Sequence, residues 1–183
     1  MNSEKVLLNK NGFCFSCVKK NSYKLNFYIE NKNIILPKII NFDLIKLIYD
    51  LNPDIYEKVT LEKINDNEAI ATLLMKHFFE DVGMPQRFTF IHVQKIMDDN
   101  TITFQSKSIK THKPDWLPDN AELTPMQNLT IVCNIITPHH VQFSCNVAFD
   151  NAFIVPPFAE KFLSIVLHNI FKRVKEFIDN IVV

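Results

Sequence analysis

The chain has 183 residues, of which 47% are hydrophobic and 22% charged, a composition typical of a globular protein. Its length predicts one domain over residues 1–183, and Lys plus Arg equals Asp plus Glu at 20 each, which argues against nucleic acid as a partner. The 2 glycines, Gly12 and Gly83, stand alone. A glycine-rich phosphate loop is therefore excluded, and we expect no cofactor.

The first residues lead into no long apolar run, so neither a signal peptide nor a transmembrane helix is expected. We therefore expect a cytoplasmic protein, and a monomer. The 4 cysteines, Cys14, Cys17, Cys133 and Cys145, should be reduced in that compartment.

The chain then alternates between strand signals and two helix signals. Two strands, 12–20 and 23–30, precede a short helix over 42–51, which Asn41 caps and Pro53 follows. Six strand-like segments come next, at 56–64, 68–78, 87–96, 101–109, 129–136 and 141–149. The last of these alternates apolar and polar residues most clearly, which is typical of a strand with one buried face.

A long amphipathic helix is predicted from Pro156 to the end of the chain. Leu163, Val166, Ile170, Val174, Phe177 and Ile181 recur at intervals of three and four, so they share one side of this helix. His168 and several lysines fall on the other side. Such a helix needs a large apolar surface to cover its stripe.

Short connections between successive strands predict an antiparallel meander. The packing solution for this order is an α+β domain in which a curved antiparallel β-sheet wraps around the long C-terminal helix. An interior of this kind often leaves a cavity for a small apolar ligand.

The segment from Thr111 to Pro125 is the one long irregular stretch. Loops of this length are often lids or binding loops. Trp116 and Leu117 form an apolar pair near its prolines, suited to enter a membrane interface. The alternative, that Trp116 folds back onto the core, remains equally open.

Three short motifs resemble the StAR-related lipid-transfer (START) family, a helix-grip fold. They are Met84-Pro85-Gln86-Arg87-Phe88-Thr89-Phe90-Ile91, then Ser106-Lys107-Ser108-Ile109, and Asp150 followed by Ile154-Val155-Pro156. The chain departs from the family where Phe88 replaces an Asp and where a Gly before the Ile-Pro pair is missing.

The resemblance implies a non-enzymatic carrier that encloses one lipid, such as a sterol or a phospholipid, and contacts membranes transiently. It also implies that the loop at 111–125 is the lid and acts with the closing helix. We expect the ligand to touch strand residues that alternation turns inward and residues on the inner face of the closing helix. The strand residues are Phe90, His92, Phe104, Ser106, Cys133, Phe143 and Cys145, and the helix residues are Phe162, Val166 and Ile170.

In the carrier, Arg87 could bind a phosphate or carboxylate head group in the cavity, although a salt bridge at a strand end is as plausible.

Two further interpretations compete with the carrier. An enzyme of the same superfamily would need an acid–base pair, for which His92 is the candidate member. A ligand-free interaction module is the third possibility.

Cys14 and Cys17 form a C-x-x-C pair, which can bind zinc or cycle a disulfide. A zinc site needs two more ligands at comparable spacing, and Cys133 and Cys145 lie twelve positions apart on different predicted strands. We therefore expect no metal site.

Overall fold

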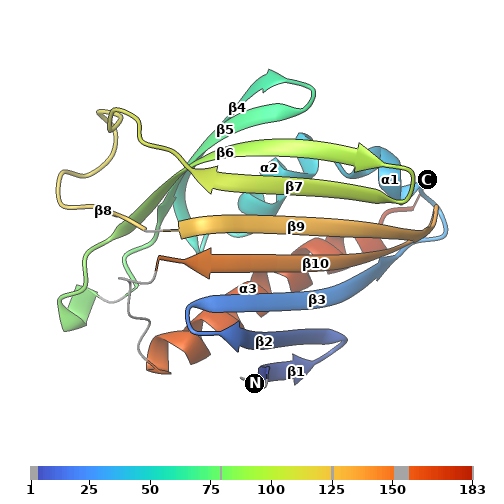
Figure 1. Ribbon diagram of the computed structural model, residues 1–183, viewed down its shortest axis with the longest axis horizontal. Coiled ribbons are helices and arrows are strands. Elements are labelled where there is room, and N and C mark those ends of the chain that lie inside the picture. The colour runs from blue at the N-terminus through green and yellow to red at the C-terminus, as the bar shows by residue number, and fades with distance from the viewer. Residues whose placement is uncertain (1–3, 79, 125, 151–156, 183) are drawn as a thin grey trace.

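A ten-stranded sheet carries the fold of the computed structural model, which describes residues 4–78, 80–124, 126–150 and 157–182. The elements, in chain order, are β1 (Lys5–Lys10), β2 (Phe13–Lys19), β3 (Ser22–Glu30), α1 (Leu36–Ile39), α2 (Phe42–Asp50), β4 (Tyr56–Asn65), β5 (Glu68–Met75), the 3₁₀ helix η1 (Glu80–Val82), β6 (Arg87–Asp98), β7 (Thr101–Ser108), β8 (Glu122–Leu123), β9 (Met126–Thr137), β10 (His140–Phe149) and α3 (Pro157–Asp179) (Figure 1).

The strand order across the sheet is β1-β2-β3-β10-β9-β7-β6-β5-β4, and every neighbouring pair on this path is antiparallel. The short β8 pairs in parallel with β6 and lies off this path. The antiparallel pairing of β3 with β10, which are far apart in sequence, thus places the first three strands beside the last two.

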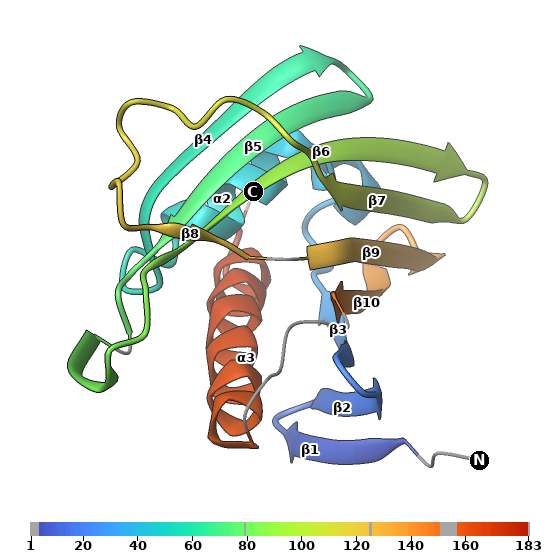
Figure 2. The same ribbon diagram turned by 60° about the vertical axis from the view of Figure 1, so that its left-hand side comes forward.

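The sheet curls around α3, as the turned view shows, with β1 to β3 on one side of the helix and β4 to β6 on the other (Figure 2). The main hydrophobic core lies inside this curl and combines the concave face of the sheet with side chains of α2 and α3. Such an α+β arrangement, a curved antiparallel sheet gripping a C-terminal helix, is the fold that the order of elements predicts.

Local sequence explains where the elements begin and turn. The side chain of Asn41 caps α2, because its Oδ1 accepts hydrogen bonds from the backbone N–H groups of Asp43 (2.8 Å) and Leu44 (3.2 Å). The β1–β2 hairpin turns at Asn11 and Gly12, whose φ angles are 54° and 79°, the left-handed pair that a tight hairpin needs.

Most predicted elements are confirmed, with several corrections. The strand predicted over 68–78 ends at Met75, and β1, α1 and β8 were not predicted. β1 gave no signal because it is an edge strand whose residues are exposed or half-buried on both faces. Residues 154–156 of the third START-like motif lie outside the described residues.

The predicted stripe of α3 is only partly correct. Val166, Ile170 and Val174 are buried as expected, but Phe177 is 44% exposed, whereas His168, predicted on the outer side, is buried. The reason is that the curled sheet reaches a second side of the helix. The His168 ring packs edge-on against Phe13 of β2, at 5.1 Å between centroids.

Candidate functional site

An apolar cavity of about 80 Å³ lies between the concave face of the sheet, α2 and α3. Its lining residues are Ile45, Ile48, Tyr49, Tyr56, Ile91, Val93, Phe104, Ser106, Leu129, Ile131, Cys145, Leu167, Ile170 and Phe171. A small neighbouring void of about 10 Å³ extends toward β3 and α1.

The register of the sheet brings the strand residues of this site together. Phe104 of β7 lies opposite Ile131 of β9, which in turn lies opposite Cys145 of β10. Ser106 lies opposite Leu129 in the next row. Directly opposed residues in an antiparallel pair project from the same face, so one row of each strand is turned toward the helices.

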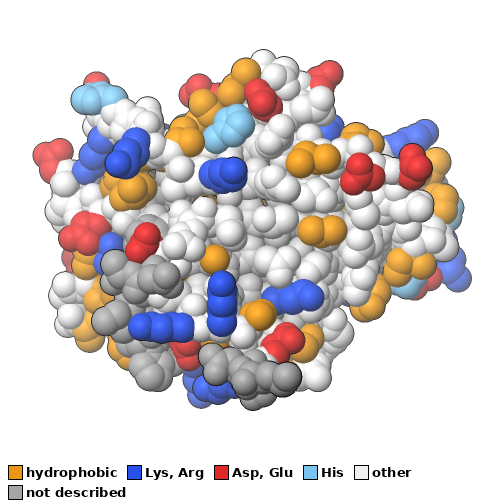
Figure 3. Space-filling view, in the orientation of Figure 1, with side chains coloured by type: hydrophobic (Ala, Val, Ile, Leu, Met, Phe, Trp, Pro, Cys, Tyr) orange, Lys and Arg blue, Asp and Glu red, His pale blue; other side chains and the backbone are white. Residues whose placement is uncertain are grey.

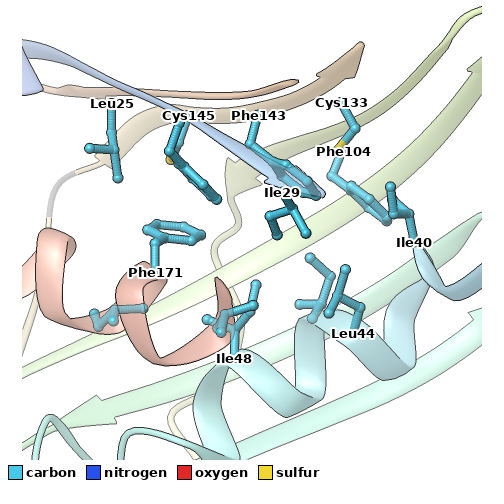
Figure 4. Close-up of a cluster of buried hydrophobic side chains, with 14 of the residues drawn as sticks. Leu25, Ile29, Ile40, Leu44, Ile48, Phe104, Cys133, Phe143, Cys145 and Phe171 are labelled. Atoms are coloured by element: carbon cyan, nitrogen blue, oxygen red, sulfur yellow. The ribbon is translucent and has the colours of Figure 1, made fainter. Parts of the chain in front are cut away.

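Aromatic rings fill much of the interior around the two cavities. Phe27 of β3 is stacked against Phe143 at 5.1 Å and contacts the ring of Phe171 on α3 at 5.2 Å. Side chains hanging from the strands, such as Phe143 and Cys145, point toward Phe171 and toward Ile48 of α2 (Figure 4). The free space is therefore well below the roughly 300–1,000 Å³ of typical ligand pockets.

The cavity disfavours charge. Burial raises the pKa of the Tyr49 and Tyr56 hydroxyls, and Cys145 adds to this effect in both cases. Burial likewise raises the pKa of the Cys145 thiol to about 12. These groups are therefore neutral at physiological pH, and the remaining lining residues are aliphatic, aromatic or, at Ser106, hydroxylic.

Six of the predicted site residues line one of the two cavities: Phe104, Ser106, Cys145 and Ile170 the larger one, and Cys133 and Phe143, again with Phe104, the smaller. Val166 is buried in the surrounding core, and Phe162 packs at its edge, where its ring meets Phe78 at 5.2 Å. Neither of them lines either of these two cavities.

The inward face predicted for β6 was wrong by one residue. Ile91 and Val93 line the cavity, whereas Phe90 packs with Phe88 in a second cluster on the opposite face of the sheet. His92 alternates with Ile91 and Val93, so it shares that opposite face. The error arose because β6 is buried on both faces near Phe90, which hides the alternation.

Arg87 lies outside the cavity as well. Its Nη1 forms a 2.9 Å ion pair with Oε2 of Glu122, where β6 meets β8. A salt bridge at a strand end was the alternative interpretation of this arginine.

The segment from 111 to 124 covers the second cluster and contributes no lining residue to either of the two cavities. Leu117 is only 4% exposed and packs with Leu74, Phe88 and Phe90. The Trp116 ring lies partly against the same cluster, and Lys58 Nζ sits 4.4 Å from its centroid. Leu117 thus does not offer an apolar side chain to a membrane, and the fold-back interpretation describes Trp116 better.

On the outer face of the sheet, the described residues form no single broad hydrophobic patch. In the view onto this face, hydrophobic side chains are scattered singly among polar and charged ones (Figure 3). This pattern agrees with the polar residues Gln142, Ser144 and Asn146, which alternate with the buried residues of β10.

The lining residues that sequence reasoning missed include four from α2 and the start of β4. Ile45 and Ile48 lie in the helix predicted over 42–51, but nothing in the sequence indicated that they face the cavity. Tyr49 and Tyr56 meet in a T-shaped contact at 5.0 Å, which depends on the approach of α2 to β4. Spacing along the chain carries no signal for such a contact.

Among the described residues, most side-chain hydrogen bonds between the closing helix and the rest of the fold lie in its C-terminal half. Asn31 Nδ2 donates to the carbonyl oxygens of Ile178 (2.6 Å) and Ile181 (3.0 Å). Arg173 forms a two-pronged ion pair with Asp54 and also donates to Asn52 Oδ1 at 2.8 Å.

The four cysteines are free thiols. Within the described parts of the chain, no cluster of three or more His, Cys, Asp or Glu side chains could hold a metal ion. The described helices also include none that is both long and apolar enough to cross a membrane.

The architecture defines a class: this is the helix-grip fold of StAR-related lipid-transfer domains. The lipid transfer and protein localization domain of human StarD13 (DLC2) superimposes with a TM-score of 0.73, over 99% of this chain and 91% of that chain, at 8% identity. Human StAR-related lipid transfer protein 5 gives 0.69 over 96% and 86%, at 11% identity. A StAR-related lipid transfer protein from Xanthomonas axonopodis gives 0.60 over 97% and 99%, at 14% identity.

Neither the scan against family models nor the search of curated protein sequences finds a match. The likeness to these proteins is therefore one of fold, at sequence identities between 8% and 14%. A shared fold does not by itself imply a shared function.

Proposed function

We propose that residues 1–183 form one lipid-binding domain that takes up a hydrophobic ligand beneath α3. The observation that carries this proposal is the apolar cavity at the centre of a fold shared with lipid-transfer domains. Ligand binding would be driven by removal of apolar surface from water, at about 25 cal/mol per Å². Transfer of the ligand between membranes is the role that we infer from this storage site.

Uptake of a lipid requires the cavity to grow, because about 80 Å³ holds only a fragment of one. The side chains best placed to yield come from α3, where Leu167, Ile170 and Phe171 form one wall. The polar ties of this helix are concentrated near its C-terminal end. We infer that its N-terminal half moves outward while the C-terminal half acts as the hinge.

We propose that the segment between β5 and β6 moves together with the N-terminal half of α3. Phe78, which follows β5, packs against Phe162 on α3, so movement of the helix would break this contact. Val82 and Phe158, 68% and 55% exposed, leave apolar surface on this segment and on the first turn of α3. We propose that these elements touch the membrane transiently and that the domain acts as a monomer in the cytoplasm, a compartment that suits its free thiols.

Native mass spectrometry of the purified protein tests the binding step. We expect a co-purifying or added lipid to appear as a discrete mass increment of one ligand per chain. Ile170→Trp, which fills the cavity from α3, should abolish the increment, whereas Ile165→Trp on the exposed side of the same helix should keep it. The proposal would be overturned if both variants carried the ligand equally, or if the wild-type protein bound no lipid at all.

A further inference from the structure

A groove lies on the surface where the C-terminal end of α3 approaches α1 and α2 (Figure 1). Its volume is about 320 Å³, and its apolar lining residues are Ile39, Leu44, Leu47, Phe177, Ile178 and Ile181. The other lining residues, Lys38, Asn41 and Asp43, are polar. Leu44 is the one residue that this groove shares with the two interior cavities.

The two sides of the groove are held in place by backbone and side-chain contacts. Asn31 and Asn33, between β3 and α1, donate hydrogen bonds to the carbonyl oxygen of Ile181 at 3.0 and 3.3 Å, which brings this connection up to the end of α3. Ile178 is only 1% exposed, whereas Phe177, one position earlier, is 44% exposed. The last turns of α3 thus carry apolar side chains that the fold covers only in part.

Apolar surface continues beyond the groove on both sides. Ile35, one turn before Ile39, is 43% exposed, and Val182, next to Ile181, is 82% exposed. Small-molecule pockets enclose roughly 70–90% of their ligand. An open groove that is extended by exposed apolar side chains is instead typical of a surface that binds a macromolecule.

The charged side chains around this groove leave an excess of positive charge. The acidic groups beside it are already paired: Asp43 with Lys63 at 2.6 Å, Glu176 with Lys172 at 3.4 Å and Asp179 with Lys175 at 2.8 Å. Glu30 alternates with the buried Ile29 and so projects from the outer face of β3. Lys32 and Lys38 are exposed and form no ion pair with any described residue. The rim is therefore complementary to carboxylates.

These features favour one kind of occupant over two others. A second copy of this chain would bring the same unpaired lysines to the interface, where like charges oppose association. A bilayer surface is flat, whereas Leu44 and Ile178, 6% and 1% exposed, line the groove where only a projecting side chain reaches them. An amphipathic helix offers both requirements, because its apolar side chains enter a groove while acidic residues beside them stay at the rim.

We propose that this groove is a docking site for an amphipathic helix of a partner protein. The helix inserts apolar side chains between α2 and the end of α3 and places a carboxylate beside Lys38. The site lies outside the interior cavities, so this inference is independent of the lipid-binding proposal and either can fail alone.

Phage display supplies defined probes for the groove. A library of random peptides of about 15 residues, four helical turns, is selected on the wild-type protein, and the enriched peptides are synthesised with a fluorescent label. We expect them to carry apolar residues at positions i, i+3 or i+4, and i+7, with at least one Asp or Glu beside these. Failure to enrich any peptide, or enrichment of peptides without acidic residues, would overturn the inference.

Fluorescence polarisation with matched variants locates the binding site. Phe177→Gln should raise the Kd of the selected peptide at least tenfold, whereas Ile165→Gln, at the same 44% exposure on α3, should not change it. Lys38→Glu should raise the Kd about threefold to tenfold, and Lys107→Glu, an exposed charge reversal on β7, should have no effect. Thermal unfolding of each variant confirms that it is folded.

Three results would contradict the docking site. One is peptide binding that Phe177→Gln and Lys38→Glu leave unchanged in folded proteins. Another is a dimer in sedimentation equilibrium that Phe177→Gln dissociates, which would make a second copy the occupant. The third is binding to phospholipid vesicles that Phe177→Gln abolishes and Ile165→Gln preserves, which would assign the groove to a membrane.

Discussion

The Tyr23 hydroxyl of β3 donates a 2.9 Å hydrogen bond to Oε1 of Glu160 in the first turn of α3. The ring of Tyr23 is almost fully buried. Burial and the neighbouring Glu160 carboxylate both raise the pKa of Tyr23, so the phenol remains a donor across the physiological range. This contact holds the N-terminal end of α3, the part of the helix that we propose moves when the cavity opens.

Loss of this hydrogen bond should loosen the start of α3 without unfolding the sheet. For Tyr23→Phe we expect about 1 kcal/mol less stability and faster hydrogen exchange over residues 158–167, with little change over 170–179. The fluorescent apolar probe Nile red should also enter and leave the cavity faster in this variant than in the wild type. Lys161→Gln, an exposed change in the same turn, is the control. A uniform rise in exchange along α3 would contradict a hinge near Arg173.

The ion pair between Arg173 and Asp54 makes part of the stability pH-dependent. The hydrogen bond from Arg173 lowers the pKa of Asp54 in the folded state. The stabilisation of the folded state by this ion pair is therefore fully present above the unfolded-state pKa of about 3.9. It is lost as the pH falls through the lower pKa of Asp54 in the folded state.

We expect Asp54→Asn to cost about 0.5–1 kcal/mol at pH 7, since both side chains are partly exposed. The difference from the wild type should shrink toward zero near pH 2. Urea unfolding at both pH values measures it. Asp50→Asn, which removes an exposed ion pair with Lys46 within α2, provides the comparison. A cost that does not change with pH would rule out the ion pair as its source.

The four thiols should fall into two classes of reactivity. Cys133 and Cys145 are buried, and burial raises the pKa of both thiols. At pH 8 we expect iodoacetamide to modify the partly exposed Cys14 and Cys17 first and to reach the buried pair only when the protein opens. Mass spectrometry of the peptides reports each site. Equal rates at Cys14 and Cys145 would mean that the cavity is open to solvent.

Leu117 should matter for stability and not for ligand binding. Truncation to Ala removes a buried side chain from the cluster beneath the 111–124 segment, so we expect a loss of about 2–3 kcal/mol. Trp116→Ala should cost less, because that ring is only partly buried. Neither variant should change Nile red affinity or binding to phospholipid vesicles. A large loss of vesicle binding in a stably folded Trp116→Ala variant would restore a membrane role for this residue.

The architecture could be predicted because its determinants are local. Alternation in β10, the Asn41 cap of α2 and the apolar spacing along α3 gave the order of elements, and the short connections between strands gave the antiparallel sheet around α3. The cavity residues on β7, β9 and β10 followed from the same alternation, as Phe104, Ser106 and Cys145 show.

The features that could not be predicted depend on contacts between segments that are far apart in the sequence. β6 carries large side chains on both faces, so Phe90 and Ile91 could not be assigned to a side until the cluster beneath Leu117 was seen. Burial of His168 likewise requires β2 to reach around the helix. The tyrosine pair of the cavity exists only because α2 lies beside β4.

The strands at the two ends of the sheet, β1 and β4, do not pair with each other, and the helices occupy the space between them. In the proposed mechanism, displacement of a helix would therefore enlarge the interior without any need to break the pairing between neighbouring strands. Opening by this route would cost side-chain packing and the polar contacts of α3, and the reach of that helix would set the upper limit on ligand size.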